Sequence, residues 1–426
     1  MKMAPYRRNK DDILARINFP LFSLQMLTNR HVLVAGGGGS SKTGVDNGFE
    51  IFELSHDGKK FYVEEVTRHE TGPNVVMNCV VSSSPNGRHT YLAAGQESHC
   101  QLYSVNSYFI SSQKNGITET VEDKSELWRR KSVTKVTSDN NNKENVTKRL
   151  KFELKPVDSV QTDFNGSEPL CRVVRVHPSG TLMATGGTDG DIRMWKFPTL
   201  EPIAKLKAHS KEIDDLDFSK YGNYFISIAK DGLAVLWDSI KGTEIRRLTW
   251  NQPQGSKYLY KRCRFGVVDG EHKCALYMLA NPTGQAKKQM SYLQQWYPEE
   301  GIIKRCADFD ESLSALAVRD DGRFIAVGTM FSGSVSIFIA FSLQKVLNIS
   351  NAHSMFVTGL EFLPVVDQQN YTVNSVAEAA VLSISVDNQV CIHTLPYRKS
   401  IPLWLAILIM IFTMFMTFLF CSYIGL

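Results

Sequence analysis

Short apolar runs separated by turns recur along most of the chain. Two stretches, 182–195 and 225–238, share one plan: an apolar run, a turn that contains Asp and Gly, and a second apolar run that reaches a Trp. Runs of this length, bounded by Gly, Asp and Asn, predict β-strands rather than helices. The pattern therefore predicts an all-β protein built from repeated strand pairs.

The spacing of these pairs identifies the repeat. Trp195 and Trp237 lie 42 residues apart, as do Asp189 and Asp231. A period of about 40–45 residues that closes on Trp, here once as Trp237-Asp238, is typical of WD repeats. The repeat predicts a β-propeller.

Four polar or aromatic residues of one repeat predict a hydrogen-bonded tetrad. They are His209, Ser227, Asp231 and Trp237. Because buried polar groups need partners, we interpret these residues as part of the fold rather than as a reactive site.

Weaker copies of the repeat extend the propeller over most of the chain. They lie at 91–103, 324–339 and 381–392, and a degenerate copy must fill 258–310. This gives about seven blades, a common number for propellers. We predict a seven-bladed WD-type propeller over residues 17–397.

Two segments depart from the repeat. Residues 1–16 are polar and basic and are predicted to precede the propeller. Residues 106–150 interrupt it, and their richness in Ser, Lys, Asn, Glu and Thr predicts a disordered insertion.

The C-terminal region has a different composition. No residue from 401 to 426 is charged, and 402–424 is almost wholly apolar. This length predicts a single transmembrane helix. Arg398 and Lys399 precede it, so the positive-inside rule places the propeller in the cytosol.

Composition narrows the class of protein. The chain has 426 residues and a net charge of +5, which is too mild to indicate nucleic-acid binding. The eight cysteines form no C-x-x-C pair and no disulfide-like framework, which suits a reducing compartment. The ten histidines show no metal-ligand spacing.

A glycine-rich stretch interrupts the first repeat at 36–48. Its beginning approaches the phosphate-binding pattern G-x-x-x-x-G-K-[ST], but Ser41 replaces the second glycine and a strand-like run, 49–54, follows instead of a helix. No helix N-terminus is available to receive phosphate groups, so we expect no bound nucleotide. Aligned with Gly187 and Gly190, the stretch holds about eight extra residues in one strand-to-strand turn. Such turns lie on a partner-binding face of propellers.

The chain resembles the prolactin regulatory element-binding protein family, the endoplasmic-reticulum WD-repeat exchange factors for the Sar-type small GTPase. The resemblance covers nearly the whole chain and the C-terminal apolar segment. The stretches that carry it are Gly36-Gly37-Gly38-Gly39 with Lys42-Thr43-Gly44 and Asn47-Gly48, Ala94-Gly95-Gln96 with His99-Cys100-Gln101-Leu102, Val160-Gln161-Thr162-Asp163-Phe164, 184–190, Arg262-Cys263-Arg264-Phe265-Gly266, and 339–344.

This resemblance implies a function. It implies a guanine-nucleotide exchange factor on the endoplasmic-reticulum membrane, which activates the Sar-type GTPase and so starts COPII vesicle budding and ER-to-Golgi transport. It implies contacts with COPII coat components and no catalytic residue, because exchange makes no bond. It also implies that the glycine loop activates the GTPase and is ordered by a potassium ion held by backbone carbonyls of 36–47. The loop residues are Gly36, Gly37, Gly38, Gly39, Lys42, Thr43, Gly44 and Asn47.

Three alternatives remain open at this stage. One is an ER-anchored scaffold without exchange activity, although a scaffold has no need of the glycine loop. Another is a transcription regulator that binds DNA, which the mild charge and the lack of a base-reading motif disfavour. The third is a lumenal orientation, for which N-glycosylation sequons begin at Asn145, Asn165, Asn348 and Asn370.

Overall fold

The structure is a computed structural model, and it describes most of the chain. The described residues are 6–7, 12–39, 44–83, 89–112, 122–123, 147–253, 256–268, 273–284, 289–365, 377–397 and 403–424.

The described strands form seven sheets, antiparallel except where β1 joins one edge, which we number as blades 1 to 7 in chain order. Each blade has an inner strand, two middle strands and an outer strand. The inner strands are β3 (Leu21–Met26), β7 (Val76–Ser83), β12 (Cys171–Val176), β16 (Ile213–Phe218), β20 (Lys257–Val267), β24 (Leu313–Val318) and β28 (Val357–Phe362). The second strands are β4 (His31–Gly37), β8 (Thr90–Gln96), β13 (Leu182–Gly187), β17 (Tyr224–Ala229), β21 (Cys274–Thr283), β25 (Phe324–Thr329) and β29 (Ala379–Ser385). The third strands are β5 (Asn47–His56), β9 (His99–Ser112), β14 (Asp191–Lys196), β18 (Ala234–Asp238), β22 (Ser291–Tyr297), β26 (Val335–Ile339) and β30 (Gln389–Leu395). The outer strands are β6 (Phe61–Glu70), β11 (Thr147–Gln161), β15 (Glu201–Lys207), β19 (Glu244–Arg247), β23 (Ile302–Phe309), β27 (Gln344–Ser350) and β2 (Ile13–Arg16).

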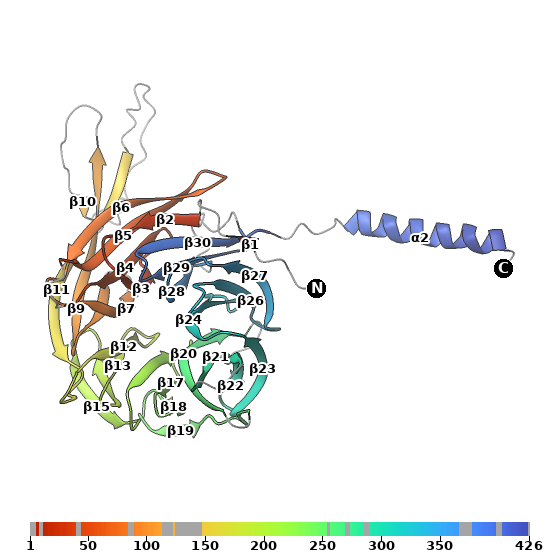
Figure 1. Cartoon of the computed structure of the whole chain (residues 1–426). Coiled ribbons are helices and arrows are strands. Elements are labelled where there is room, and N and C mark those ends of the chain that lie inside the picture. The colour runs from red at the N-terminus through yellow and green to blue at the C-terminus, as the bar shows by residue number, and fades with distance from the viewer. Residues whose placement is uncertain are drawn as a thin grey trace, which may run out of the picture.

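The seven blades are arranged as a closed ring (Figure 1). Each inner strand contacts the inner strand of the next blade, and β28 of blade 7 contacts β3 of blade 1. The prediction of a seven-bladed WD-type propeller is confirmed.

The ring is closed by a strand from the N-terminal region. β2 pairs antiparallel with β30, so the outer strand of blade 7 comes from the start of the chain. A shorter strand, β1 (Tyr6–Arg7), pairs in parallel with β27 of blade 6. The prediction that residues 1–16 precede the propeller therefore differs from the structure, in which blade 7 begins at Ile13. The reason is topological: the strand has only four residues, and only its pairing with β30 makes it part of a sheet.

The insertion in blade 2 is partly ordered. β9 continues to Ser112 and β11 begins at Thr147, and the two strands pair along their whole length. A short strand, β10 (Glu122–Asp123), pairs with β9, and together these strands extend beyond the rim of the ring (Figure 1). The expected disorder of 106–150 is therefore wrong for 106–112, 122–123 and 147–150, because backbone pairing with β9 orders these residues. Residues 113–121 and 124–146 lie outside the described part of the chain.

The core consists of apolar layers between neighbouring blades. The layer between blades 3 and 4, for example, contains Ile192, Leu216, Phe225 and Trp237. Burial of this apolar surface holds each blade against the next. All eight cysteines are free.

A single described helix, α2 (Leu403–Ile424), follows blade 7. Large apolar side chains along this helix are exposed. Among the described residues, no helix qualifies as sufficiently long and apolar to traverse a bilayer.

The direction of the strands gives the ring two distinct faces. Turns between second and third strands, together with the connections from one blade to the next, lie on one face, which we call the loop face. Turns between first and second and between third and fourth strands lie on the other, which we call the opposite face. The stretch between β4 and β5 therefore projects from the loop face, whereas the chain leaves β30 at the opposite face.

Candidate functional site

The glycine loop connects β4 and β5 of blade 1. Gly36 and Gly37 end β4, where the backbone of Pro20 approaches closely, and the Gly37 amide donates to the Pro20 carbonyl at 3.0 Å. A Cβ atom on Gly36 would lie 1.9 Å from that carbonyl oxygen. At this position glycine is therefore required by the close approach of two backbones.

Asn47 fixes the base of the loop. Its side-chain oxygen accepts a bond of 2.9 Å from the Gly39 amide, and its side-chain nitrogen donates to the Gly39 carbonyl at 3.2 Å. The same nitrogen donates to the carbonyl of Gly72, in the connection between blades 1 and 2, at 2.9 Å. The Asn47 side chain is buried. It therefore acts as a clamp that ties the loop to its own blade and to the next connection.

The two described glycines nearest the tip of the loop lie in open space. Gly39 and Gly44 both have positive φ angles, 87° and 73°, and a Cβ atom on either would meet nothing within 4 Å. Gly38 lies between the strand and this open part. Lys42 and Thr43 lie outside the described residues, so their predicted role is not placed. The six described loop residues thus divide into buried supports (Gly36, Gly37, Asn47) and less buried positions nearer the tip (Gly38, Gly39, Gly44).

An ion pair holds the C-terminal end of the loop, where the loop joins β5. Arg68 of β6 lies 2.6 Å from the carboxylate of Asp46 and 3.7 Å from that of Glu50. Burial raises the pKa of Glu50, and Glu65 adds to this effect, while Arg68 opposes it. The loop is thus attached to β6 as well as to its own two strands.

The predicted blade tetrad forms a chain of hydrogen bonds in blade 4. The His209 ring lies 3.1 Å from Asp231 through Nδ1 and 2.8 Å from Ser227 through Nε2. The Trp237 Nε1 group donates to the Ser227 hydroxyl at 2.9 Å. The four residues link the connection from blade 3 to the middle strands, which is a structural role.

Blade 7 contains a second chain of this kind, which the sequence pattern did not reveal. His353 contacts Asp387 at 3.1 Å and Ser383 at 2.7 Å, and Ser383 contacts His393 at 2.8 Å. His393 lies where blade 4 has Trp237. Because this blade has no Trp at that position, its sequence resembles the WD repeat only weakly.

Asp163 holds together the connection between blades 2 and 3, which also lies on the loop face. Its carboxylate accepts bonds from the backbone amides of Thr188, Asn165 and Leu170. Burial raises its pKa, but these bonds and one from the Thr188 hydroxyl outweigh burial and leave the pKa lowered. The next residue, Phe164, is 60% exposed, and the Arg193 guanidinium lies 4.9 Å from its ring centroid. The sequence singled out this stretch only through its family resemblance.

Blade 6 and the connection to blade 7 expose further apolar side chains on the loop face. Phe331 is 75% exposed, and Met355 and Phe356 are partly exposed. Their backbones are held together because the His353 amide donates to the Gly333 carbonyl at 3.0 Å. Exposed apolar groups on one face mark a surface for another protein.

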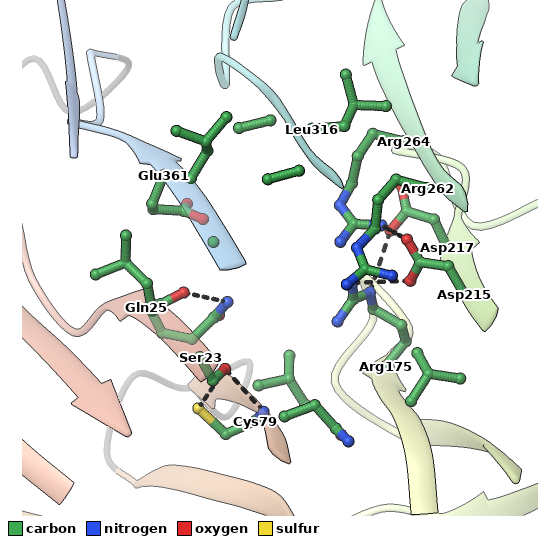
Figure 2. Close-up of a pocket in the computed structure, with 18 of the residues that line it drawn as sticks. Ser23, Gln25, Cys79, Arg175, Asp215, Asp217, Arg262, Arg264, Leu316 and Glu361 are labelled. Carbon is green, nitrogen blue, oxygen red and sulfur yellow. Dashed lines mark hydrogen bonds and ion pairs between the residues drawn. The ribbon is translucent and has the colours of Figure 1, made fainter. Parts of the chain in front are cut away.

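A charged channel runs through the middle of the ring. Its volume is about 340 Å³, and inner strands of the blades line it. In Figure 2, Arg175, Arg262 and Arg264 gather with Asp215 and Asp217 on one side. Asp215 lies 2.6 Å from Arg264 and 3.3 Å from Arg175. The two arginines outweigh burial and keep the pKa of Asp215 low.

Glu361 lies across the channel from this cluster (Figure 2). Burial raises its pKa from 4.5 to about 7, although Lys220 and the arginines oppose the rise. Ion pairs between charged side chains, rather than apolar packing, therefore connect the inner strands around the channel. Arg262 and Arg264, from the stretch Arg262 to Gly266, have a structural role there.

Two backbone carbonyls in the described part of the glycine loop already accept hydrogen bonds. The carbonyl of Gly39 accepts from Asn47, and the carbonyl of Asn47 accepts from Thr71 at 3.0 Å. No cluster of three His, Cys, Asp or Glu residues suited to a metal occurs among the described residues. The potassium ion remains a prediction from the family resemblance.

Comparison with known proteins finds the same WD repeat, and it finds relatives that match nearly the whole chain. The family "WD domain, G-beta repeat" matches residues 158–196 and 200–238. The chain is 32% identical over 414 residues to "Guanine nucleotide-exchange factor SEC12" of Mus musculus, which covers 95% of this chain and 96% of the mouse protein. The Rattus norvegicus protein of the same name is 32% identical over 416 residues, with the same coverage. "SEC12-like protein 2" of Arabidopsis thaliana is 26% identical over 189 residues, which is 44% of this chain and 45% of that protein.

Proposed function

We infer the function from one premise: this chain belongs to the SEC12 family of guanine nucleotide-exchange factors, which it matches over nearly its full length. Exchange is a binding reaction, so the protein makes and breaks no covalent bond. We propose that its partner is a Sar-type small GTPase and that the glycine loop acts on the nucleotide site of that GTPase.

The proposed mechanism is thermodynamic linkage. An exchange factor binds the nucleotide-free GTPase more tightly than the nucleotide-bound form, and reciprocity requires it to weaken nucleotide binding by the same factor. A weakening of ~10⁵ corresponds to about 7 kcal/mol of differential contact. The contacts must therefore come from groups that reach the nucleotide site.

The clamped loop is the observation that carries this proposal. Asn47 and the Arg68 ion pair hold its base, while Gly39 and Gly44, on either side of the tip, lie in open space on the loop face. A loop held in advance loses less conformational entropy when a partner docks. Phe164 and the exposed group around Phe331 would supply apolar contact on the same face.

The test measures GDP release from the Sar-type GTPase, with the full chain added in detergent. We expect fast release with the natural protein and a loss of about tenfold to a hundredfold with Asn47→Ala, because the loop base is then free. A triple variant with Lys42, Thr43 and Asn47 changed to Ala should lose more.

A matched control separates the loop from the fold. Asn281 clamps blade 5 in the same manner, since its side chain bonds to the carbonyl and amide of Leu313 at 2.7 and 2.9 Å. Asn281→Ala should leave GDP release unchanged once the protein is folded. If both variants lose the same amount of GDP-release activity, the loop is not the part that acts on the GTPase. If the natural protein does not accelerate GDP release, the scaffold alternative is favoured.

We also propose that α2 anchors the protein in the endoplasmic-reticulum membrane, with the propeller in the cytosol. Support comes from its 22 residues, which contain no acidic or basic side chain, and from the large apolar side chains that it exposes. Carbonate extraction of membranes should leave the full chain in the pellet and release a chain truncated before 401. Glycans on Asn165 or Asn348 would contradict the cytosolic orientation.

By the same resemblance, we propose that the exchange reaction starts COPII budding at that membrane. The effective concentration of an anchored factor near a membrane-bound GTPase is higher than in solution. Potassium in place of sodium in the exchange assay tests the proposed ion. Equal rates in the two salts would contradict it.

A further inference from the structure

A groove on the opposite face of the ring is not used by the proposed exchange reaction. It lies at blades 5 and 6 and beside the end of blade 7, with a volume of about 640 Å³. Its lining residues include Val268, Tyr297, Lys304, Arg323, Phe341 and Tyr397. Cavities of this size that combine apolar walls with a few polar groups are typical of ligand sites.

Exposed aromatic side chains form one side of the groove. Phe341, in the turn between β26 and β27, is 71% exposed, and Tyr397, just after β30, is 58% exposed. Ile240, in the turn between β18 and β19, is a further exposed apolar residue on the same face. These residues are costly to leave in water, and aromatic groups of this kind favour a membrane interface.

Positive charge accompanies the aromatic residues. Four cationic side chains line the groove against two acidic ones, and one acid, Asp321, is already paired with Arg319 at 2.8 Å. Lys304 lies 4.4 Å from the centroid of the Tyr297 ring. The groove therefore combines an apolar wall with an excess of cations, which fits an anion attached to an apolar body.

The position of α2 indicates where such a ligand comes from. Tyr397 lines the groove, and α2 begins at Leu403. Six residue steps span at most about 21 Å. Any bilayer that takes up the apolar helix therefore lies within that distance of the groove, on the side from which β30 ends.

We propose that this groove binds the headgroup of an anionic phospholipid in the bilayer that holds α2. The phosphate lies beside Lys304 and Arg323, and the glycerol region lies against Phe341 and Tyr397. The inference rests on the proposed anchoring of α2. As a consequence, the opposite face is held against the membrane and the loop face is directed away from it, toward the GTPase.

The test uses the full chain in nanodiscs of phosphatidylcholine, with or without about one fifth phosphatidylserine, and measures amide hydrogen exchange. We expect at least severalfold slower exchange at 339–343 and 395–397 in the anionic nanodiscs. The double variant Lys304→Gln with Arg323→Gln should lose that difference.

A control pair removes the same charge from the loop face. Lys207→Gln with Lys211→Gln changes two exposed lysines near the connection between blades 3 and 4. This pair should keep the lipid-dependent protection. Equal amide hydrogen exchange in the two kinds of nanodisc, or the same result from both double variants, would contradict lipid binding in the groove.

The outcomes for the groove and for exchange activity are separable. GDP release in detergent with no protection of the groove rejects the groove alone. Protection without GDP release rejects the exchange function alone. A chain that does not incorporate into nanodiscs rejects both the anchor and the groove, while leaving the exchange assay in detergent as the measure of function.

Discussion

Glu361 is an acid whose ionisation depends on its place in the channel. Its carboxyl group faces the channel from β28, where it is partly shielded from solvent. Because burial raises its pKa to about 7, the folded protein binds a proton more readily than the unfolded chain between pH 4.5 and 7. Protonation of Glu361 therefore favours the folded state fully below pH 4.5, and this contribution to the free energy of unfolding is lost as the pH rises through about 7.

We expect Glu361→Gln to stabilise the protein at pH 8 by about 1–3 kcal/mol and to have little effect at pH 5, because glutamine carries no charge to bury. Thermal unfolding of both proteins at the two pH values measures this difference. The exposed Glu70→Gln is the control and should change little at either pH. A constant difference across pH would show that Glu361 stays ionised in the fold.

Gly36 gives a second prediction at the residue scale. Gly36→Ala places a methyl group against the Pro20 carbonyl, 1.9 Å away before relaxation, so β3 and β4 must separate. We expect a loss of about 2–4 kcal/mol in urea unfolding. Gly39→Ala meets open space and carries only the strain of a positive φ, so it should cost about 1 kcal/mol. Similar losses in the two variants would contradict the close approach of the backbones.

At the scale of the element, the tetrad joins the strands of blade 4. Ser227 is its centre, because it bonds both the His209 ring and the Trp237 indole. Ser227→Ala leaves two buried nitrogens without a partner, and we expect a loss of about 2–4 kcal/mol in chemical denaturation. Ser210→Ala is a matched control, because Ser210 is exposed and its hydrogen bond to Asp231 comes from its backbone amide. A small effect of Ser227→Ala would mean that water replaces the hydroxyl.

At the scale of the whole molecule, the ring depends on a strand from the start of the chain. β2 completes blade 7, so removal of residues 1–16 leaves β30 with an open edge and the ring without its closure. We expect this variant to lose cooperative unfolding or to lower the melting temperature by about 10 °C or more. Removal of 1–11 keeps β2 and should be much milder. Equal behaviour of the two variants would mean that the ring does not rely on β2.

The sequence by itself determined the repeat, the tetrad residues of blade 4 and the apolar C-terminal segment, because these follow from local alternation, spacing and composition. It could not place β2, since a strand of four residues is recognisable only when β30 pairs with it. Nor could it show that Asn47 is a buried clamp or that Phe164 is displayed by Asp163, because those roles depend on residues of other connections.

Only the tertiary structure brought the charged groups of the inner strands into one channel, and only it placed Tyr397 beside a groove formed by blades 5 and 6. The physical reason is the same in both cases. Local sequence decides how each strand alternates, whereas closure of the ring decides which side chains from distant strands share one space.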